Sequence, residues 1–145
     1  MHIHPVRLRP GQDLRDALER FVRLRRVRAG VVLSVVGSVR DPRLRFAGAD
    51  ESTPLTGAFE IVALVGTLSP DGAHLHIALA DRDGVVVGGH LSRGCAVHTT
   101  AEIAIAELPG VRFARRFDAA TGYRELMIRR GVRKSGVRKG GARKG

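Results

Sequence analysis

Residues 74–90, His-Leu-His-Ile-Ala-Leu-Ala-Asp-Arg-Asp-Gly-Val-Val-Val-Gly-Gly-His, set the architecture of this chain. In residues 74–80, leucine and isoleucine alternate with histidine and alanine, which is the two-residue period of a β-strand. Residues 81–84, Asp-Arg-Asp-Gly, have the composition of a tight turn, and residues 85–87 are a run of valine. The segment therefore predicts two antiparallel strands joined by a turn.

The length of that turn determines on which face of the hairpin His90 lies. A three-residue loop at residues 82–84, closed by a glycine in the left-handed conformation, is a common hairpin geometry and pairs His76 with His90. A two-residue loop at residues 83–84 would instead pair Ile77 with His90 and turn His90 to the other face. Both registers are open at this point.

The three-residue loop would bring three imidazoles together. His74 and His76 are two residues apart in a strand, so they point to the same side, about 6.5–7 Å apart along it, and His90 opposite His76 would share that face. Three neutral imidazoles can bind Zn²⁺ or a similar divalent metal and leave one position for water, a carboxylate or a ligand. The alternative is that these histidines are hydrogen-bonded to the backbone or exposed on the sheet. We expect solvated surface positions for the other three histidines, His2, His4 and His98.

One helix is clear in the rest of the chain. Residues 13–24 place apolar side chains at helical spacing, directly after Pro10-Gly11 and with Asp13 at the start. The apolar stripe consists of Leu14, Ala17, Leu18, Phe21 and Val22. The polar face carries Arg15, Arg23 and Arg26.

Most of the chain after this helix has the composition of β-strands. The predicted strands are residues 31–36, a short strand through Val39, Leu44 and Phe46, and residues 59–68, 96–108 and 123–129. Residues 96–108 could also form a helix, but Thr and Ile at positions 99, 100, 103 and 105 favour a strand. Many short strands with one clear N-terminal helix indicate an α+β fold with an antiparallel or mixed sheet.

Positive charge is concentrated at the C-terminal end. The 145 residues can form one hydrophobic core, and their net charge is +11. Residues 131–145 have six basic residues and no acidic one, so we expect a folded domain at residues 1–130 and a disordered basic tail at residues 131–145. The basic residues are Arg133, Lys134, Arg138, Lys139, Arg143 and Lys144. We expect this tail to contact DNA or RNA phosphates without sequence preference; the alternative is a solubilising extension with weak, incidental affinity. For the body of the chain, the alternative to a nucleic-acid role is an arginine-rich composition alone.

Several classes of protein are disfavoured. Cys95 is the only cysteine, which excludes an internal disulfide, and we expect it in the core rather than as a nucleophile. Neither a signal peptide nor a membrane span of about 18 apolar residues is readable, so a cytoplasmic location, including association with the nucleoid, is expected. No phosphate-binding loop, nucleophile elbow or catalytic triad is present. Glu60 and Glu102 are the only strand carboxylates that we nominate as a base, and neither has a fixed relation to a metal in the sequence, so a binding protein is favoured over an enzyme.

The chain resembles the plants-and-prokaryotes conserved (PPC) domain, which stands alone in bacteria and archaea and is joined to AT-hooks in plant DNA-binding proteins. The resemblance covers roughly residues 3–130. It is carried, in order, by RPGQDL at residues 9–14, AGVVLSVVGS at 29–38, GAFEIV at 57–62, HLH at 74–76, DRDG at 81–84, GGHL at 88–91 and TTAE at 99–102.

This resemblance implies an antiparallel α+β fold, a homotrimer and a metal held by His74, His76 and His90. It also suggests Glu102 as a further ligand, as a carboxylate behind a ligand, or as a structural carboxylate at the trimer contact. The AT-hook core Arg-Gly-Arg-Pro is absent, and Ala58 stands where the plant segment has arginine and Val62 where it has leucine. Minor-groove recognition therefore does not carry over.

Three functions fit these observations. The first is a homotrimeric PPC-domain DNA-binding protein with a three-histidine metal site and basic tails, which in a trimer would present 18 basic residues. The second is a metal-dependent small-molecule sensor or enzyme, in which a metal with an open position activates water or polarises a carbonyl. The third is a trimeric protein-interaction module.

Overall fold

One helix and ten strands make up residues 1–131, the residues that the computed structural model describes. The elements are β1 (His2–Leu8), α1 (Leu14–Arg25), β2 (Gly30–Arg40), β3 (Arg43–Arg45), β4 (Thr53–Pro54), β5 (Ala58–Ser69), β6 (Gly72–Ala80), β7 (Val86–Leu91), β8 (Ala96–Glu107), β9 (Val111–Phe117) and β10 (Arg124–Arg130). Apart from its first residue, the predicted basic tail at residues 131–145 lies outside the described residues. The boundary at residue 130 therefore stays a prediction.

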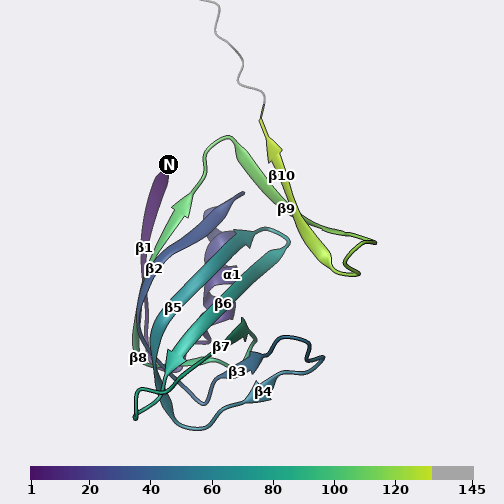
Figure 1. Cartoon of the computed structure of the whole chain (residues 1–145). Coiled ribbons are helices and arrows are strands. Elements are labelled where there is room, and N and C mark those ends of the chain that lie inside the picture. The colour runs from purple at the N-terminus through teal and green to yellow at the C-terminus, as the bar shows by residue number, and fades with distance from the viewer. Residues whose placement is uncertain (132–145) are drawn as a thin grey trace, which may run out of the picture.

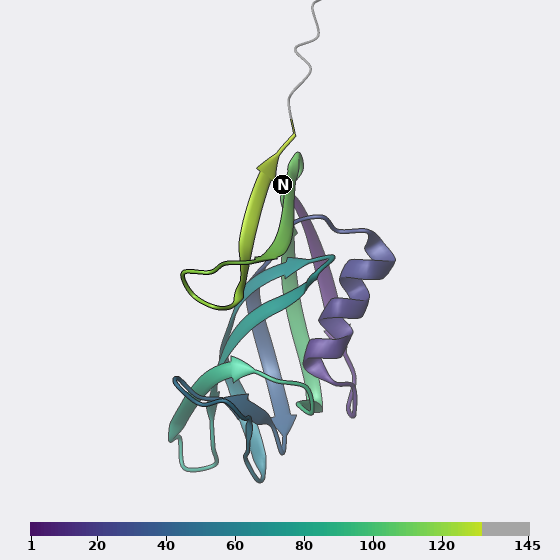
Figure 2. The same ribbon diagram turned by 90° about the vertical axis from the view of Figure 1, so that its right-hand side faces the viewer.

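Eight strands form a curved sheet in the order β1-β8-β2-β5-β6-β7-β3-β4, and all neighbouring strands are antiparallel (Figure 1). The other two strands, β9 and β10, form a separate hairpin. Figure 2 shows α1 lying along one side of the large sheet. The predicted α+β class with an antiparallel sheet is confirmed.

The helix forms where its apolar spacing predicted it. The Asp13 carboxylate accepts a hydrogen bond from the backbone N–H of Asp16 at 2.8 Å, which caps the first turn. The same carboxylate accepts hydrogen bonds from the backbone of Gly94 and Cys95 at 2.7 and 2.9 Å, which ties the start of α1 to the chain before β8. In the described part of the chain, no helix is long and apolar enough to cross a membrane.

The core is aliphatic. Leu14, Leu18 and Val22 of α1 are buried in one cluster with leucine, isoleucine and valine side chains of the sheet. Cys95 is also fully buried, and burial raises the pKa of its thiol to about 12. The thiol therefore stays protonated at neutral pH, which agrees with a packing role.

Strand predictions were right for the long apolar runs and wrong or missing elsewhere. Residues 96–108 form strand β8, as their β-branched residues favoured. The predicted short strand through Val39, Leu44 and Phe46 was wrong: Val39 belongs to β2, Leu44 belongs to β3, and Phe46 follows β3. The turn at Asp41, where φ is +48°, separates the two strands.

Strands β1, β4 and β9 were not predicted. β1 pairs only with β8 at the edge of the sheet, where Pro5 is tolerated because an edge strand does not need every N–H. The sequence of β9 is Val-Arg-Phe-Ala-Arg-Arg-Phe, and because of its three arginines it lacks a clear alternation of apolar and polar residues.

Candidate metal centre

The β6–β7 hairpin has the register that brings the histidines together. His76 is directly opposite His90, and Leu79 is opposite Val87. Gly84 has φ +79° and its N–H donates to the carbonyl of Asp81 at 3.0 Å. The Asp81 carboxylate also accepts hydrogen bonds from the N–H groups of Asp83 and Val85, each at 2.9 Å. The three-residue loop is therefore confirmed.

The three imidazoles converge on one place. Each offers one ring nitrogen, and these nitrogens all lie within 4.8 Å of one another. The ring centroids are 5.1 Å apart for His74 and His76, 5.1 Å for His74 and His90, and 5.7 Å for His76 and His90. Two strands of one hairpin thus supply the three side chains.

The protonation state of the cluster suits metal binding. Burial, followed by the nearby charges of His74 and Arg15, lowers the pKa of His90 to about 4. Burial, followed by the positive charge of Arg115, also lowers the pKa of His74. Both rings are therefore neutral at neutral pH, which is the form that donates a lone pair to a metal.

One buried atom of the cluster has no partner. Among the described residues, no group forms a hydrogen bond with Nδ1 of His90. Nε2 of the same ring lies 3.4 Å from Nη1 of Arg15, a group that can only donate. Buried polar atoms are normally satisfied, so Nδ1 of His90 needs a partner that residues 1–131 do not supply.

These donors fit a small divalent ion. Zinc binds histidine nitrogen at about 2.0–2.1 Å in tetrahedral geometry, which separates two ligand nitrogens by about 3.3 Å. Nitrogens that already lie within 4.8 Å can reach this spacing by small side-chain rotations. The histidines at residues 74, 76 and 90 therefore fit the predicted ligand set.

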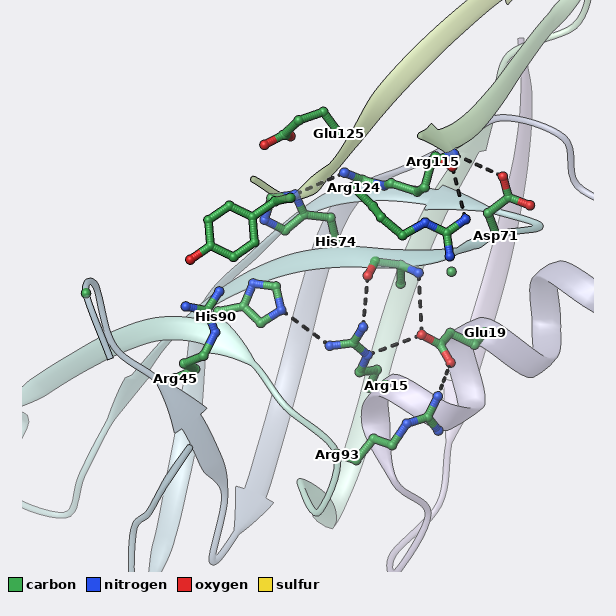
Figure 3. A pocket seen from close by; sticks show the side chains of 14 residues that line it. Arg15, Glu19, Arg45, Asp71, His74, His90, Arg93, Arg115, Arg124 and Glu125 are labelled. Carbon is green, nitrogen blue, oxygen red and sulfur yellow. Dashed lines mark hydrogen bonds and ion pairs between the residues drawn. The ribbon is translucent and has the colours of Figure 1, made fainter. Parts of the chain in front are cut away.

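A cavity of about 690 Å³ opens beside His74 and His90 (Figure 3). Its walls come from α1, β3, the β6–β7 hairpin and the β9–β10 hairpin. Arg15 enters from α1 and Arg115 from β9, so arginines approach the imidazoles from two sides. The sequence signalled Arg15 only as part of the polar face of the helix, and nothing in the sequence pointed to Arg115.

The other candidate carboxylates lie away from this cluster. Glu102 is exposed on β8, opposite Arg7 of β1 and Val36 of β2, and it is not part of the three-histidine group. The suggestion that Glu102 is a further ligand is therefore wrong within one protomer. Glu60 is exposed on β5, opposite Ala80, and is not part of the group either.

The remaining histidines are separate from the cluster. His98 lies within hydrogen-bonding distance of Arg40, 3.2 Å from its Nε. His2 is exposed, as expected. His4 differs from the expectation of a solvated position, because it is partly buried, packs edge-on against Phe21 and lies 3.0 Å from the Glu107 carboxylate. The six basic residues predicted to contact nucleic acid lie outside the described residues.

Comparisons with known proteins identify the family of this chain. A sequence model of the Plants and Prokaryotes Conserved (PCC) domain matches residues 1–109. The chain belongs to this family. The resemblance stated from the sequence motifs is thus confirmed, and the matched residues include strands β6 and β7, which carry the three histidines.

Two curated proteins are similar to this chain in sequence. The chain is 51% identical over 128 residues to a bifunctional protein GlmU of Synechococcus, covering 88% of the chain and 21% of that relative. The chain therefore spans about a fifth of the length of this protein. It is also 40% identical over 92 residues to AT-hook motif nuclear-localized protein 20 of Arabidopsis thaliana, covering 59% of the chain and 32% of that protein.

Two solved structures share the fold. A hypothetical protein from Salmonella cholerae-suis has a TM-score of 0.87 and 43% identity, with 89% of this chain and 94% of that chain covered. A protein from Archaeoglobus fulgidus described as metal-containing has a TM-score of 0.76 and 27% identity, with 88% of this chain and 94% of that chain covered.

Proposed function

We propose that this PCC-domain protein binds a divalent metal ion through His74, His76 and His90, and that this ion is zinc. The observation that carries the proposal is the convergence of three imidazoles whose ligand nitrogens lie within 4.8 Å of one another. The unpartnered Nδ1 of His90 and the metal-containing archaeal relative support it. Elemental analysis of the purified chain tests it, and about one ion per chain is expected.

The chemistry around the site favours binding over catalysis. A three-histidine metal would supply a Lewis acid with one open position. The histidines hold the ion, and Arg15 and Arg115 place positive charge beside it. Glu19, a carboxylate on the same cavity wall, pairs with Arg15 at 3.2 Å and Arg93 at 2.5 Å. That pairing leaves it poorly suited to accept a proton from a metal-bound water.

We also propose that the domain assembles as a homotrimer, as the family resemblance implied. Exposed apolar side chains on two adjacent strands support this: Leu33 and Val36 of β2, and Val62 and Val65 of β5, are each more than half exposed. Exposed apolar groups of this kind are typical of contact surfaces between chains. Light scattering on the full chain should give three times 15.6 kDa, and the Val36→Glu/Val65→Glu variant should give a single chain. A monomeric wild type would contradict the assembly.

A second candidate function is nucleic-acid contact through the basic tail. The charge distribution favours it, because the last 15 residues hold six basic and no acidic residues. The relative from Arabidopsis is named for an AT-hook motif and for nuclear localization, which supports DNA as the partner. The contact would be with phosphates, so it would not depend on base sequence.

Truncation tests the tail. Removing residues 132–145 should weaken binding to duplex DNA and flatten the salt dependence, because log K falls with log salt by about 0.9 for each phosphate contacted. Fluorescence anisotropy with two unrelated duplexes measures both quantities. A full-length variant with the six tail Arg and Lys residues replaced by Gln is the matched control for chain length and should behave like the truncated chain. Unchanged affinity in both variants would overturn the tail's role.

A further inference from the structure

The cavity beside the histidines has the dimensions of a small-molecule site. Its volume of about 690 Å³ lies within the roughly 300–1,000 Å³ that ligand sites occupy. Segments far apart in the sequence form it, from α1 near the N-terminus to the β9–β10 hairpin near residue 125. It therefore depends on the tertiary fold and adjoins two of the three proposed metal ligands, His74 and His90.

The walls of this cavity carry an excess of positive charge. Five arginines and three carboxylates line it, namely Arg15, Arg45, Arg93, Arg115, Arg124, Glu19, Asp71 and Glu125. Glu19 pairs with two of the arginines. Within residues 1–131, Arg45, Arg115 and Arg124 form no ion pair. A divalent ion on the histidines would add two more positive charges to this surface.

Arg115 is held rigidly next to His74. The residue is only 8% exposed, and its Nη2 donates to Oγ1 of Thr67 at 2.8 Å, while Nη1 lies 3.4 Å from Nδ1 of His74. The Asp71 carboxylate accepts a hydrogen bond from the backbone N–H of Arg115 at 2.9 Å and none from the Arg115 guanidinium. A buried guanidinium keeps its charge, and such a charge without a counter-ion is costly.

Arg15 is held as firmly on the other side. Its guanidinium donates hydrogen bonds to the carbonyls of Leu91 and Ala73 at 2.8 and 3.1 Å, respectively. It also pairs with the Glu19 carboxylate, and its Nη1 lies 3.4 Å from Nε2 of His90. Figure 3 shows Arg15 reaching up from α1 and Arg115 coming from β9, with His74 and His90 in the same cavity. Two fixed cations next to a metal ion repel it unless an anion lies among them.

We infer that the cavity binds a small anionic ligand bearing a carboxylate or phosphate group, which Arg15 and Arg115 hold while one oxygen takes the open position of the metal. The inference rests on the proposed metal site. Both oxyanions accept the parallel hydrogen bonds that a guanidinium donates, and both bind divalent metals through oxygen.

The β9–β10 hairpin would set the specificity of this site. It supplies Arg115, Arg124 and Tyr123 to the cavity, yet it lies beyond residue 109, where the PCC match ends. The sheet inside the matched domain would thus provide the metal ligands, and the hairpin would provide the groups that recognise the rest of the anion.

Calorimetry on the zinc-loaded full chain tests the inference. Inorganic phosphate and succinate are titrated separately, in a buffer free of other phosphates and carboxylates, with metal content measured in each sample. We expect one anion per metal for at least one probe and at least tenfold weaker binding to the metal-free chain. Arg115→Ala and Arg15→Ala should each retain the metal and lose about 10- to 100-fold in anion affinity, the cost of a charge-assisted hydrogen bond.

Two further variants keep the outcome clear. Arg112→Ala removes an exposed arginine from the same strand, β9, outside this cavity, and should leave anion affinity unchanged. Loss of the Arg115 side chain could disturb folding, so Arg115→Lys serves as a second variant that keeps the positive charge. It should weaken anion binding, because a lysine cannot donate the paired hydrogen bonds. The tighter of the two probes identifies the class of oxyanion.

The failures are distinguishable. A chain that holds zinc but binds neither anion, or whose anion affinity is the same in the Arg15, Arg115 and Arg112 variants, overturns the anion site and leaves the metal site standing. A chain that holds no metal overturns both.

Discussion

The purified chain is expected to contain about one zinc or similar divalent ion, and the His76→Ala and His90→Ala variants to contain almost none. Each substitution leaves two imidazoles, and no carboxylate belongs to the cluster in the described residues to replace the third. Loss of a partner behind a metal ligand already costs about 10- to 100-fold in affinity, so loss of a ligand should cost more than about 100-fold. Elemental analysis and competition with a chelating dye measure the two quantities.

His98→Ala is the matched control for these variants. His98 lies on β8 with Arg40 and is not part of the cluster, so its loss should leave the metal content unchanged. Circular dichroism should show the same fold in the His76→Ala variant as in the wild type, because His76 is exposed and contributes little to the core. Wild-type protein without stoichiometric metal, or equal metal content in the His76 and His98 variants, would contradict the proposed ligands.

Gly66→Ala should be one of the most destabilising single substitutions in the domain. Gly66 lies in β5 with φ +146°, and a Cβ there would come 2.0 Å from the carbonyl oxygen of His74. Backbone strain and overpacking each cost about 1–3 kcal/mol, so we expect a loss of about 3–5 kcal/mol in the free energy of unfolding. Urea denaturation of the metal-free chain measures this loss.

Gly57→Ala separates the clash from the backbone strain. Gly57 also has a positive φ, +108°, but a Cβ there would meet nothing within 4 Å. We expect a loss of only about 1–2 kcal/mol, from conformation alone. Equal losses in the two variants would show that the close approach of β5 to the His74 backbone is not a constraint. Because the clash falls on His74, the Gly66 variant should also bind metal more weakly than the Gly57 variant.

The hairpin that carries the histidines could be predicted because its information is local. The alternation of residues 74–80 places two histidines on one face, and Gly84 permits the left-handed residue that closes a three-residue loop. The loop length remained ambiguous in the sequence, since a two-residue turn was equally compatible with Asp83-Gly84. Hydrogen bonds from the backbone to the Asp81 side chain stabilise the longer loop.

Edge strands and the order of the sheet were beyond prediction. β8 lies between β1 and β2, so the edge of the sheet at β1 pairs residues about 100 positions apart, such as Ile3 with Ala106. Local propensity carries no information about such pairings, because each strand could form a ladder with several others. β1 contains proline and β9 is rich in arginine, so neither shows the pattern of a buried strand.

The amino-acid sequence by itself determined the helix, the long strands, the family and the three histidines, because each of these follows from spacing along a few neighbouring residues. The tertiary structure alone decided that Arg15 and Arg115 lie beside those histidines, 100 residues apart in the chain and 3.4 Å from His90 and His74 respectively. An arginine on the polar face of a helix or in a basic strand normally predicts a solvated surface position. Only the packing of α1 and the β9–β10 hairpin around one cavity makes these two residues part of a site.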